Sequence, residues 1–259
     1  MAESPATTSF LGPAIRKLES CTIVLDEDGF PAGMPWDQGI ATIGDQCVDW
    51  AEEMLAQPDG LSAGQPWRFA QWQARYLMWW YAVDDDGEWL FTGGQLVLPK
   101  GAGKSPLAAV IACIELLGPC IFKEFGPDDE AMGMPHPSPD FLLAAVAEKQ
   151  TKNTMRLAAS MLRNGKIFEV MGHLMDIGLK LIRTPNGQLQ ITASGAASLE
   201  GGRTTGAILD EPHRWLKANG GIEMYETIQG NLTKTNGRGL QTTNAWIPGR
   251  DSVAETMGQ

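Results

Sequence analysis

The segment Leu98–Ser105, which reads LPKGAGKS, constrains the fold of this 259-residue chain more than any other. The residues Gln95–Leu98 predict a short strand, and Lys104–Leu117 has the composition of a buried helix. Gly101 and Gly103 lie at the junction, where a residue without a side chain lets the backbone approach a ligand closely. A strand, a glycine-rich turn and a helix that begins with Lys-Ser together predict a loop that binds the phosphates of a nucleotide.

Lys104 and Ser105 have the chemistry that such a loop needs. A lysine at the start of the helix can reach the β- and γ-phosphates of ATP, and the serine hydroxyl beside it can coordinate Mg²⁺. The positive end of the helix dipole and the backbone N–H groups of Gly101–Gly103 attract the same anion. Leu98 stands where the common pattern has its first glycine. An ordinary strand-to-helix turn is therefore the alternative interpretation of this segment.

A second signal is the segment GAILDE, in which the apolar strand Ala207–Leu209 runs into Asp210 and Glu211. In α/β folds the carboxyl ends of parallel strands form the edge where ligands bind. Asp210 would hold Mg²⁺ through its water shell, and Glu211 would orient and deprotonate an attacking water. An adjacent glutamate fits hydrolysis better than transfer to another substrate. Taken alone, the segment could also be an ordinary acidic strand end.

A third signal is the strand Leu240–Thr243, which is followed by Asn244. A strand that ends in threonine and asparagine can place hydroxyl or amide groups beside the γ-phosphate, where they would respond to hydrolysis. A polar strand end without a function is the alternative interpretation.

Strands and helices alternate over most of the chain after Trp89. Phe141–Val146 reads as a buried strand, Glu148–Leu162 as a helix, and Leu179–Arg183 with Leu189–Ala193 as a hairpin. This alternation predicts an α/β fold with a central, mostly parallel sheet that is flanked by helices on both faces. We expect the strand of the phosphate loop to lie beside the acidic strand, or to be separated from it by the strand Leu240–Thr243.

The N-terminal quarter of the chain has a different character. Residues 1–65 read as a lead-in with one short helix, Asp45–Ala56, and residues 66–259 as the nucleotide-binding domain. The first 43 residues are rich in proline, glycine and acidic residues, so we expect an extended or partly ordered segment. Trp67–Val83 carries aromatic residues at helical spacing, which indicates packing in the core.

Composition excludes several classes of protein. A formal net charge of −11 argues against a chain whose whole surface coats nucleic acid, although it leaves room for a local basic patch. The longest apolar run, Pro106–Phe122, is interrupted by Glu115, Gly118 and Pro119, so it predicts a buried helix and not a membrane span. The four cysteines form no CxxC pair and indicate reduced thiols in a soluble, intracellular protein. They are Cys21, Cys47, Cys113 and Cys120.

Taken in order, these segments resemble the ATPase domain of the terminase large subunit, the DNA-packaging motor of tailed bacteriophages. The resemblance covers about residues 65 to 250 and rests on FAQWQARYLMWW, VLPKGAGKSPLAA, FLLAAVAEKQTKNT, SGAASLEGGRTTGAILDEPHRW and LQTTNAW. It implies a P-loop NTPase fold with additional-strand catalytic-glutamate architecture.

The resemblance also implies roles for residues at matching positions. Gln73 would contact the adenine, and Lys100 takes the place of an arginine that is common in the family, with the charge but without the planar guanidinium. Arg203 would be an arginine finger that acts on the neighbouring subunit, or else an ordinary surface arginine, and Thr243 or Asn244 would be the coupling residue. The residues expected to bind the nucleotide are Gln73, Lys100, Gly101, Ala102, Gly103, Lys104 and Ser105. Ser105 and Asp210 are expected to hold the metal. The expected catalytic residues are Lys104, Arg203 and Glu211.

The implied function is ATP hydrolysis, with ATP and Mg²⁺ bound, that drives double-stranded DNA into a viral procapsid. Such a motor implies a ring of identical subunits around the DNA, with the small terminase subunit and the capsid portal as further partners and no membrane. It would act in the cytoplasm of the infected bacterial host. The nuclease domain that usually follows in the family does not fit after residue 250, so we expect no nuclease activity from this chain.

Three other functions share part of this pattern. A helicase-like or recombination ATPase has the same loop and acidic pair, but it would normally need a second motor domain. A nucleotide-dependent switch or scaffold without hydrolysis would have no need of Glu211. A small-molecule kinase would leave Thr243 and Asn244 unexplained.

The three histidines carry no metal-binding pattern. His213 follows Glu211 by two residues and could tune it, with a surface or supporting histidine as the alternative. His136 and His173 have no partners at the spacing of metal ligands. The only metal that we expect is the Mg²⁺ of the nucleotide.

Overall fold

The computed structural model describes residues 8–9, 31–193, 199 and 201–257. Most of the first 43 residues, including Cys21, lie outside these residues. The expected division at residue 65 stays a prediction.

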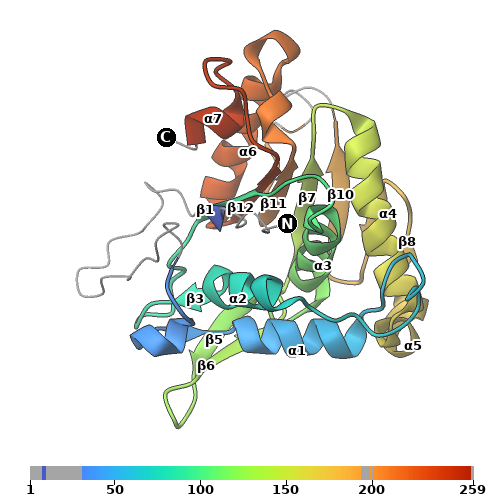
Figure 1. The fold of residues 1–259 in the computed structure, drawn as a ribbon. Helices are drawn as coiled ribbons and strands as arrows, with labels where there is room; N and C mark the ends of the chain where they lie inside the picture. The colour runs from blue at the N-terminus through green and yellow to red at the C-terminus, as the bar shows by residue number, and fades with distance from the viewer. Residues whose placement is uncertain (1–7, 10–30, 194–198, 200, 258–259) are drawn as a thin grey trace, which may run out of the picture.

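A single eight-stranded sheet forms the centre of the molecule (Figure 1). Its strands, in spatial order, are β1 (Thr8–Ser9), β4 (Gly93–Val97), β12 (Arg238–Thr243), β11 (Gly206–Asp210), β7 (Asp140–Ala144), β10 (Gln188–Thr192), β9 (Leu181–Arg183) and β8 (Asp176–Ile177). The inner pairings from β4 to β10 are parallel, and the pairings with β1, β9 and β8 are antiparallel. The strand of the phosphate loop is therefore separated from the acidic strand by β12, which is one of the two expected arrangements. The expected hairpin is confirmed as β9–β10.

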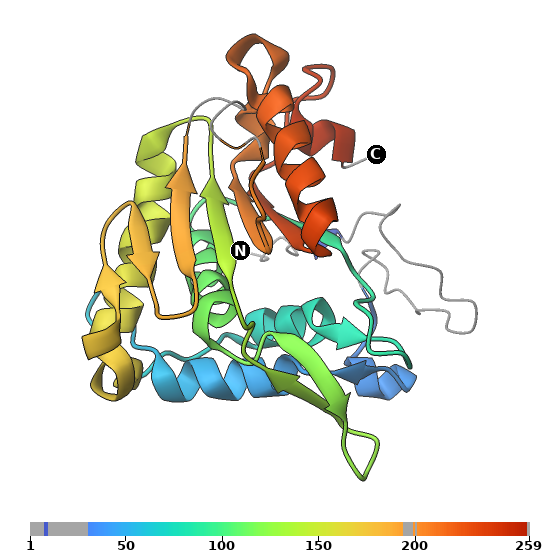
Figure 2. The ribbon, with the colours of Figure 1, turned by 180° about the vertical axis from the view of Figure 1, so that it is seen from behind.

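Helices cover both faces of the sheet. The α-helices are α1 (Gly44–Met54), α2 (Gln71–Trp80), α3 (Lys104–Leu117), α4 (Glu148–Asn164), α5 (Lys166–Met171), α6 (Gly221–Thr235) and α7 (Val253–Met257). The 3₁₀-helices are η1 (Pro35–Gln38), η2 (Gly172–Leu174), η4 (Pro212–Arg214) and η5 (Lys217–Asn219). Helices α3 and α4 lie on the face that is seen in Figure 1, and α6 lies on the opposite face, which Figure 2 shows.

Alternation along the inner strands divides the core in two. Leu143 and Ile208 point into the larger core, with α3, while Leu142 and Leu209 point into the smaller one, with α6. Because successive side chains of a strand point to opposite faces, strands that are apolar throughout need a helix on each side. The buried parallel strands and the two helical layers are consequences of the same pattern.

Two parts of the sequence fold differently from expectation. The apolar run Pro106–Phe122 is not one helix, because α3 ends at Leu117, where Gly118 and Pro119 cannot continue it. The end of the run enters a small hairpin of β5 (Ile121–Phe125) and β6 (Ala131–Met134).

The aromatic helix is also shorter than expected. It ends at Trp80, and the chain continues into β3 (Ala82–Val83), which pairs with β2 (Ala41–Thr42). Helix α6 was not expected at all, since its glycines and threonines have low helix propensity.

A buried arginine joins the start of β12 to the end of α3. The guanidinium of Arg238 lies 3.7 Å from the ring centroid of Trp89, 4.5 Å from that of Trp80 and 4.9 Å from that of Tyr81. It forms an ion pair with Glu115 at 3.3 Å, and the Tyr81 hydroxyl donates to the same carboxylate at 2.8 Å. Burial raises the pKa of Glu115, and the charge of Arg238 opposes that rise. The positive charge of Arg238 and the negative charge of Glu115 are therefore buried together and compensate each other.

We predict that Arg238→Ala lowers the free energy of unfolding by about 3–5 kcal/mol, because it leaves the Glu115 carboxylate buried without its counter-charge. Urea unfolding would measure the change. Arg183→Ala is a matched control, since the ion pair of Arg183 with Asp176 is exposed on both sides and should contribute about 1 kcal/mol or less. Equal effects of the two substitutions would contradict the role given to Arg238.

Candidate functional site

The phosphate loop has the expected form of a turn between β4 and α3. Gly101 and Gly103 have φ angles of 87° and 90°, in the left-handed region that favours glycine. Gly103 caps the helix, and Lys104 is its first residue. A side chain at Gly103 would also lie 3.4 Å from Nε2 of Gln73. The backbone conformation therefore favours glycine at this position, and the contact with α2 is an ordinary van der Waals contact.

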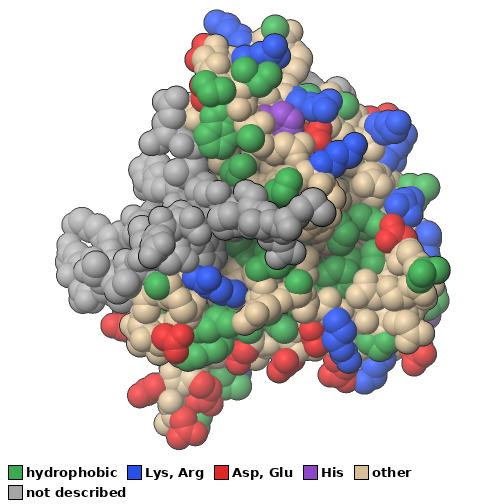
Figure 3. All heavy atoms as spheres, viewed as in Figure 1, with side chains coloured by type: hydrophobic (Ala, Val, Ile, Leu, Met, Phe, Trp, Pro, Cys, Tyr) green, Lys and Arg blue, Asp and Glu red, His purple; other side chains and the backbone are tan. Residues whose placement is uncertain are grey.

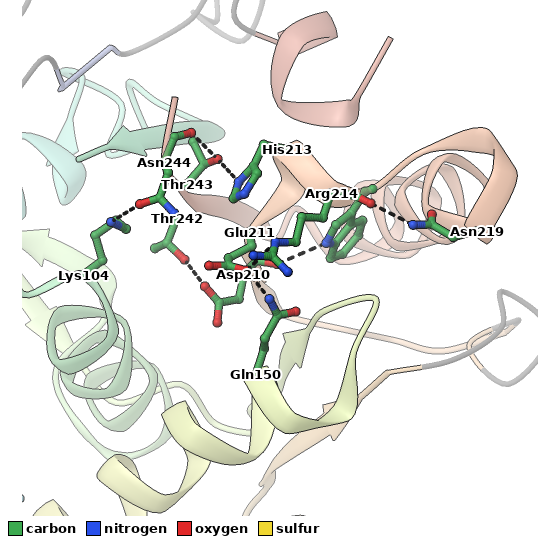
Figure 4. Close-up of polar contacts among 11 residues, drawn as sticks. Lys104, Gln150, Asp210, Glu211, His213, Arg214, Asn219, Thr242, Thr243 and Asn244 are labelled. Carbon is green, nitrogen blue, oxygen red and sulfur yellow. Dashed lines mark hydrogen bonds and ion pairs between the residues drawn. The ribbon is translucent and has the colours of Figure 1, made fainter. Parts of the chain in front are cut away.

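Lys104 connects the loop to the end of β12. Its Nζ donates to the carbonyl oxygens of Leu98 at 2.6 Å and Pro99 at 2.9 Å. It also donates to Oδ1 of Asn244 at 2.9 Å, a contact that Figure 4 shows. These three acceptors use all three N–H donors of an ammonium group. Burial lowers the pKa of Lys104, and the carboxylates of Asp210 and Glu211 oppose the shift. A phosphate oxygen that binds Lys104 has to replace one of these acceptors.

Asp210 lies at the carboxyl end of β11 and is partly buried. The Thr242 hydroxyl, on the neighbouring strand, donates to its Oδ1 at 3.0 Å, and Trp215 Nε1 donates to its backbone oxygen at 3.1 Å. Burial raises the pKa of the Asp210 carboxyl, while the hydrogen bond from Thr242 lowers it. The carboxylate is therefore fixed in place but poorly solvated, which favours binding of a cation.

Glu211 has an unusual backbone conformation, with φ of 53° and ψ of 49°. A residue with a side chain in this left-handed region costs about 1–2 kcal/mol, and the backbone hydrogen bond from Glu211 N to Thr242 O at 2.8 Å holds it there. On the side chain, Oε2 forms an ion pair with Arg214 Nε at 2.9 Å and accepts a hydrogen bond from Gln150 Nε2. The sequence did not indicate either partner. Arg214 had only its i+3 spacing as a signal, and Gln150 comes from the start of α4.

The end of β12 contacts η4 through a histidine. His213 Nδ1 lies 2.8 Å from Oγ1 of Thr243, whose hydroxyl donates to the backbone oxygen of Asn244 at 2.7 Å. Thr243 is completely buried. Burial lowers the pKa of His213. The loop, the acidic pair and the coupling strand therefore meet at the carboxyl ends of β4, β12 and β11, as Figure 4 shows.

Three of the expected residues lie away from these contacts. Gln73 is buried, and its Oε1 accepts a hydrogen bond from Ala70 N at 2.9 Å, which leaves Nε2 facing Gly103. Lys100 is exposed on the loop. Arg203 is exposed before the start of β11 and lines a hollow of about 870 Å³ with Lys234. That hollow lies at the opposite end of the strand from Asp210, so Arg203 is not part of this chain's own site.

The donor set fits a metal that is bound together with a nucleotide. Among the described residues, no group of three or more histidine, cysteine, aspartate or glutamate side chains could hold a metal ion. Mg²⁺ in nucleotide sites usually takes one or two oxygens from the protein and others from phosphates and water. The hydroxyl of Ser105 and the carboxylate of Asp210 supply that number.

Among the described residues, no helix combines the length and the apolar character that a membrane span requires.

Comparison with known proteins supports the fold. No protein-family model matches the chain. The Gene 13 proteins of Mycobacterium phages D29 and L5 are 38% and 37% identical to it over 190 residues, which are 71% of this chain but 31% and 32% of those proteins. The crystal structure of the HK97 bacteriophage large terminase is similar with a TM-score of 0.59 and 18% identity, over 79% of this chain and 38% of that one.

These similarities and the strand order define the fold class. The chain has an α/β fold with a central, mostly parallel sheet, in which β12 lies between the loop strand β4 and the acidic strand β11. It shares this fold with the HK97 large terminase, and its curated relatives are phage proteins. The fold class expected from the sequence is confirmed. The chain spans about a third of the length of the curated relatives that it matches.

We predict that Asp210→Asn stabilises the protein near pH 8 and that this gain shrinks toward about pH 4. Burial raises the pKa of Asp210 above its value in the unfolded chain, so the carboxyl favours the fold at low pH and this contribution is lost as the pH rises through the folded pKa. The asparagine keeps an acceptor for Thr242 and does not ionise. Urea unfolding at the two pH values would measure the difference. Asp128→Asn, at an exposed position, is the control, and an Asp210→Asn variant less stable than the native chain near pH 8 would contradict the prediction.

Proposed function

We propose that the chain is the ATPase domain of a terminase large subunit, which hydrolyses ATP to drive double-stranded DNA into a procapsid. The observation that carries the proposal is the convergence of Lys104, Asp210, Glu211 and Asn244 at the ends of three adjacent strands. Each group has a role in nucleotide hydrolysis, and no simpler function needs all four. The fold that the chain shares with the HK97 large terminase and its similarity to phage proteins support the same conclusion.

The phosphates would bind at the start of α3. Backbone N–H groups of the loop and the helix dipole attract the anion, and Lys104 would exchange an acceptor such as Asn244 for a phosphate oxygen. Ser105 and Asp210 would hold Mg²⁺, which neutralises charge on the β- and γ-phosphates. Gln73 would contact the adenine from α2, beside Gly103.

Glu211 would be the general base. The water oxygen forms a bond to the γ-phosphorus while the bond to the β–γ bridging oxygen breaks, ADP keeps that oxygen, and a proton of the water passes to Glu211. Arg214 and Gln150 both bind Oε2, so the proton would go to the other carboxylate oxygen, Oε1. The left-handed backbone of Glu211 is consistent with a strained position that serves the reaction.

The site needs a further cation to stabilise the transition state, and a neighbouring subunit could supply it. Arg203 lies at the far end of β11, so it would act on the adjacent member of a ring of identical subunits. An arginine finger contributes roughly 10³-fold or more to the rate. Lys100, exposed on the loop, would be a second phosphate contact.

The charge distribution limits where DNA could lie. On the face shown in Figure 3, acidic side chains gather at the tip of the β5–β6 hairpin, which carries Asp128, Asp129 and Glu130, whereas lysines and arginines lie mostly over the upper and right-hand parts. A negatively charged duplex would avoid the hairpin. The full motor would also bind the small terminase subunit and the portal, in the cytoplasm of the bacterial host.

We predict that ATP turnover per subunit rises with protein concentration and is stimulated by duplex DNA. Glu211→Gln should lower turnover by about 10²-fold or more, and Arg203→Ala by about 10³-fold. Arg183→Ala, another exposed arginine, is the control and should retain turnover.

Mixing the two inactive variants tests whether the arginine acts in trans. An Arg203→Ala subunit has an intact site, and a Glu211→Gln subunit has an intact finger, so the mixture should recover part of the turnover. Without recovery, Arg203 is not a finger that acts in trans. Turnover that is indifferent to Glu211→Gln would show that the acidic pair is assigned wrongly.

A further inference from the structure

His213 contacts the coupling strand at its most buried point. Its Nδ1 lies 2.8 Å from Oγ1 of Thr243, which is the last residue of β12 and is completely buried. The ring comes from η4, immediately after the acidic pair, so this contact joins the strand that ends in Asp210 to the strand that ends in Thr243. A histidine at this position therefore connects the acidic pair to the coupling strand.

The hydrogen atoms in this contact can be assigned by counting. The Thr243 hydroxyl has one hydrogen, and the backbone oxygen of Asn244, at 2.7 Å, can only accept. Thr243 therefore donates to Asn244, and the hydrogen between Thr243 and His213 belongs to Nδ1 of the ring. A neutral histidine must then be the tautomer that carries its hydrogen on Nδ1.

Burial favours the neutral form of the His213 ring. Burial lowers the pKa of His213, the carboxylate of Glu211 opposes the shift, and the cations Arg214 and Lys104 add to it. An N–H donor on Nδ1 is thus present near neutral pH without a positive charge beside Lys104. The donor orients the Thr243 hydroxyl, the hydroxyl binds the backbone of Asn244, and the Asn244 side chain accepts from Lys104 at 2.9 Å.

We propose that His213 is a positioning residue that holds Thr243 and Asn244 against Lys104 through its Nδ1–H donor. This role rests on the proposed ATP hydrolysis, because it places the coupling residues where a phosphate must displace Asn244. His213 touches neither the phosphates nor the attacking water in this assignment. It sets the geometry of the groups that do.

Substitutions that keep or remove one donor test the proposal. The amide nitrogen of an asparagine is as many bonds from Cα as Nδ1 of histidine, so His213→Asn should keep turnover within about threefold. His213→Ala and Thr243→Val should each lower kcat for ATP by about tenfold, with KM nearly unchanged, because they remove a hydrogen bond that positions the site. The double variant should be no worse than either single variant, since both remove the same contact. His213→Gln, whose amide lies at the Nε2 position, should resemble His213→Ala.

Multiplying effects in the double variant, or a His213→Ala chain with native kcat, would overturn the proposal. A second measurement is independent of hydrolysis. The ¹⁵N chemical shifts of the three histidines should show one ring fixed as the Nδ1–H tautomer, which His213→Asn removes and Thr243→Val converts to a mixture. If the native and Glu211→Gln chains are equally inactive, the proposed function fails. The ¹⁵N chemical shifts then still show whether His213 donates a hydrogen bond to Thr243. A ring with its hydrogen on Nε2 in the native chain would overturn the assignment.

Discussion

The hydrogen-bonded position of β12 between β4 and β11 is the constraint on which the site depends. Both of its edges are paired in parallel, with Thr242 opposite Asp210 on one side and Leu96 on the other, and all of its residues are buried. A strand fixed on both sides cannot shift its register without exposing apolar side chains and breaking backbone hydrogen bonds. The pairing therefore fixes the last residues of β12 between the phosphate loop and the acidic pair.

A buried charged group lies at or beside each end of β12, and the two groups differ in how completely their charges are compensated. At its start, Arg238 is compensated by Glu115 and by three aromatic rings. Beside its other end, Asp210 has a single hydroxyl donor, and burial raises the pKa of its carboxyl. The first end stabilises the fold, whereas the second leaves a carboxylate that gains from binding a cation. Stability and function are thus divided along one strand.

Local patterns in the sequence predicted the elements of this site well. The loop, the acidic pair and Thr243 with Asn244 each lie in a contiguous stretch where glycine spacing or an apolar strand identifies them, and β12 took one of the two expected places. Contacts between distant segments could not be predicted in this way. Gln150 approaches Glu211 only because β7 lies beside β11, and His213 meets Thr243 only because β12 does. The bounds of α3, Lys104–Leu117, were predicted, whereas α6 was not, because a helix that contains two glycines and three threonines depends on tertiary contacts that a single sequence does not specify.

Helix α3 and strand β12 run side by side in opposite directions and are joined at both ends. Lys104 binds Asn244 at one end, and Glu115 binds Arg238 at the other, about 16 Å away along the helix. The Arg238 end is buried and held by several partners, while the Lys104 end is held by one side-chain hydrogen bond. Because β12 is paired with β4 on one edge and with β11 on the other, opening that bond would release the Lys104 ammonium and the chain after Asn244, and would leave the helix and the strand joined at Arg238.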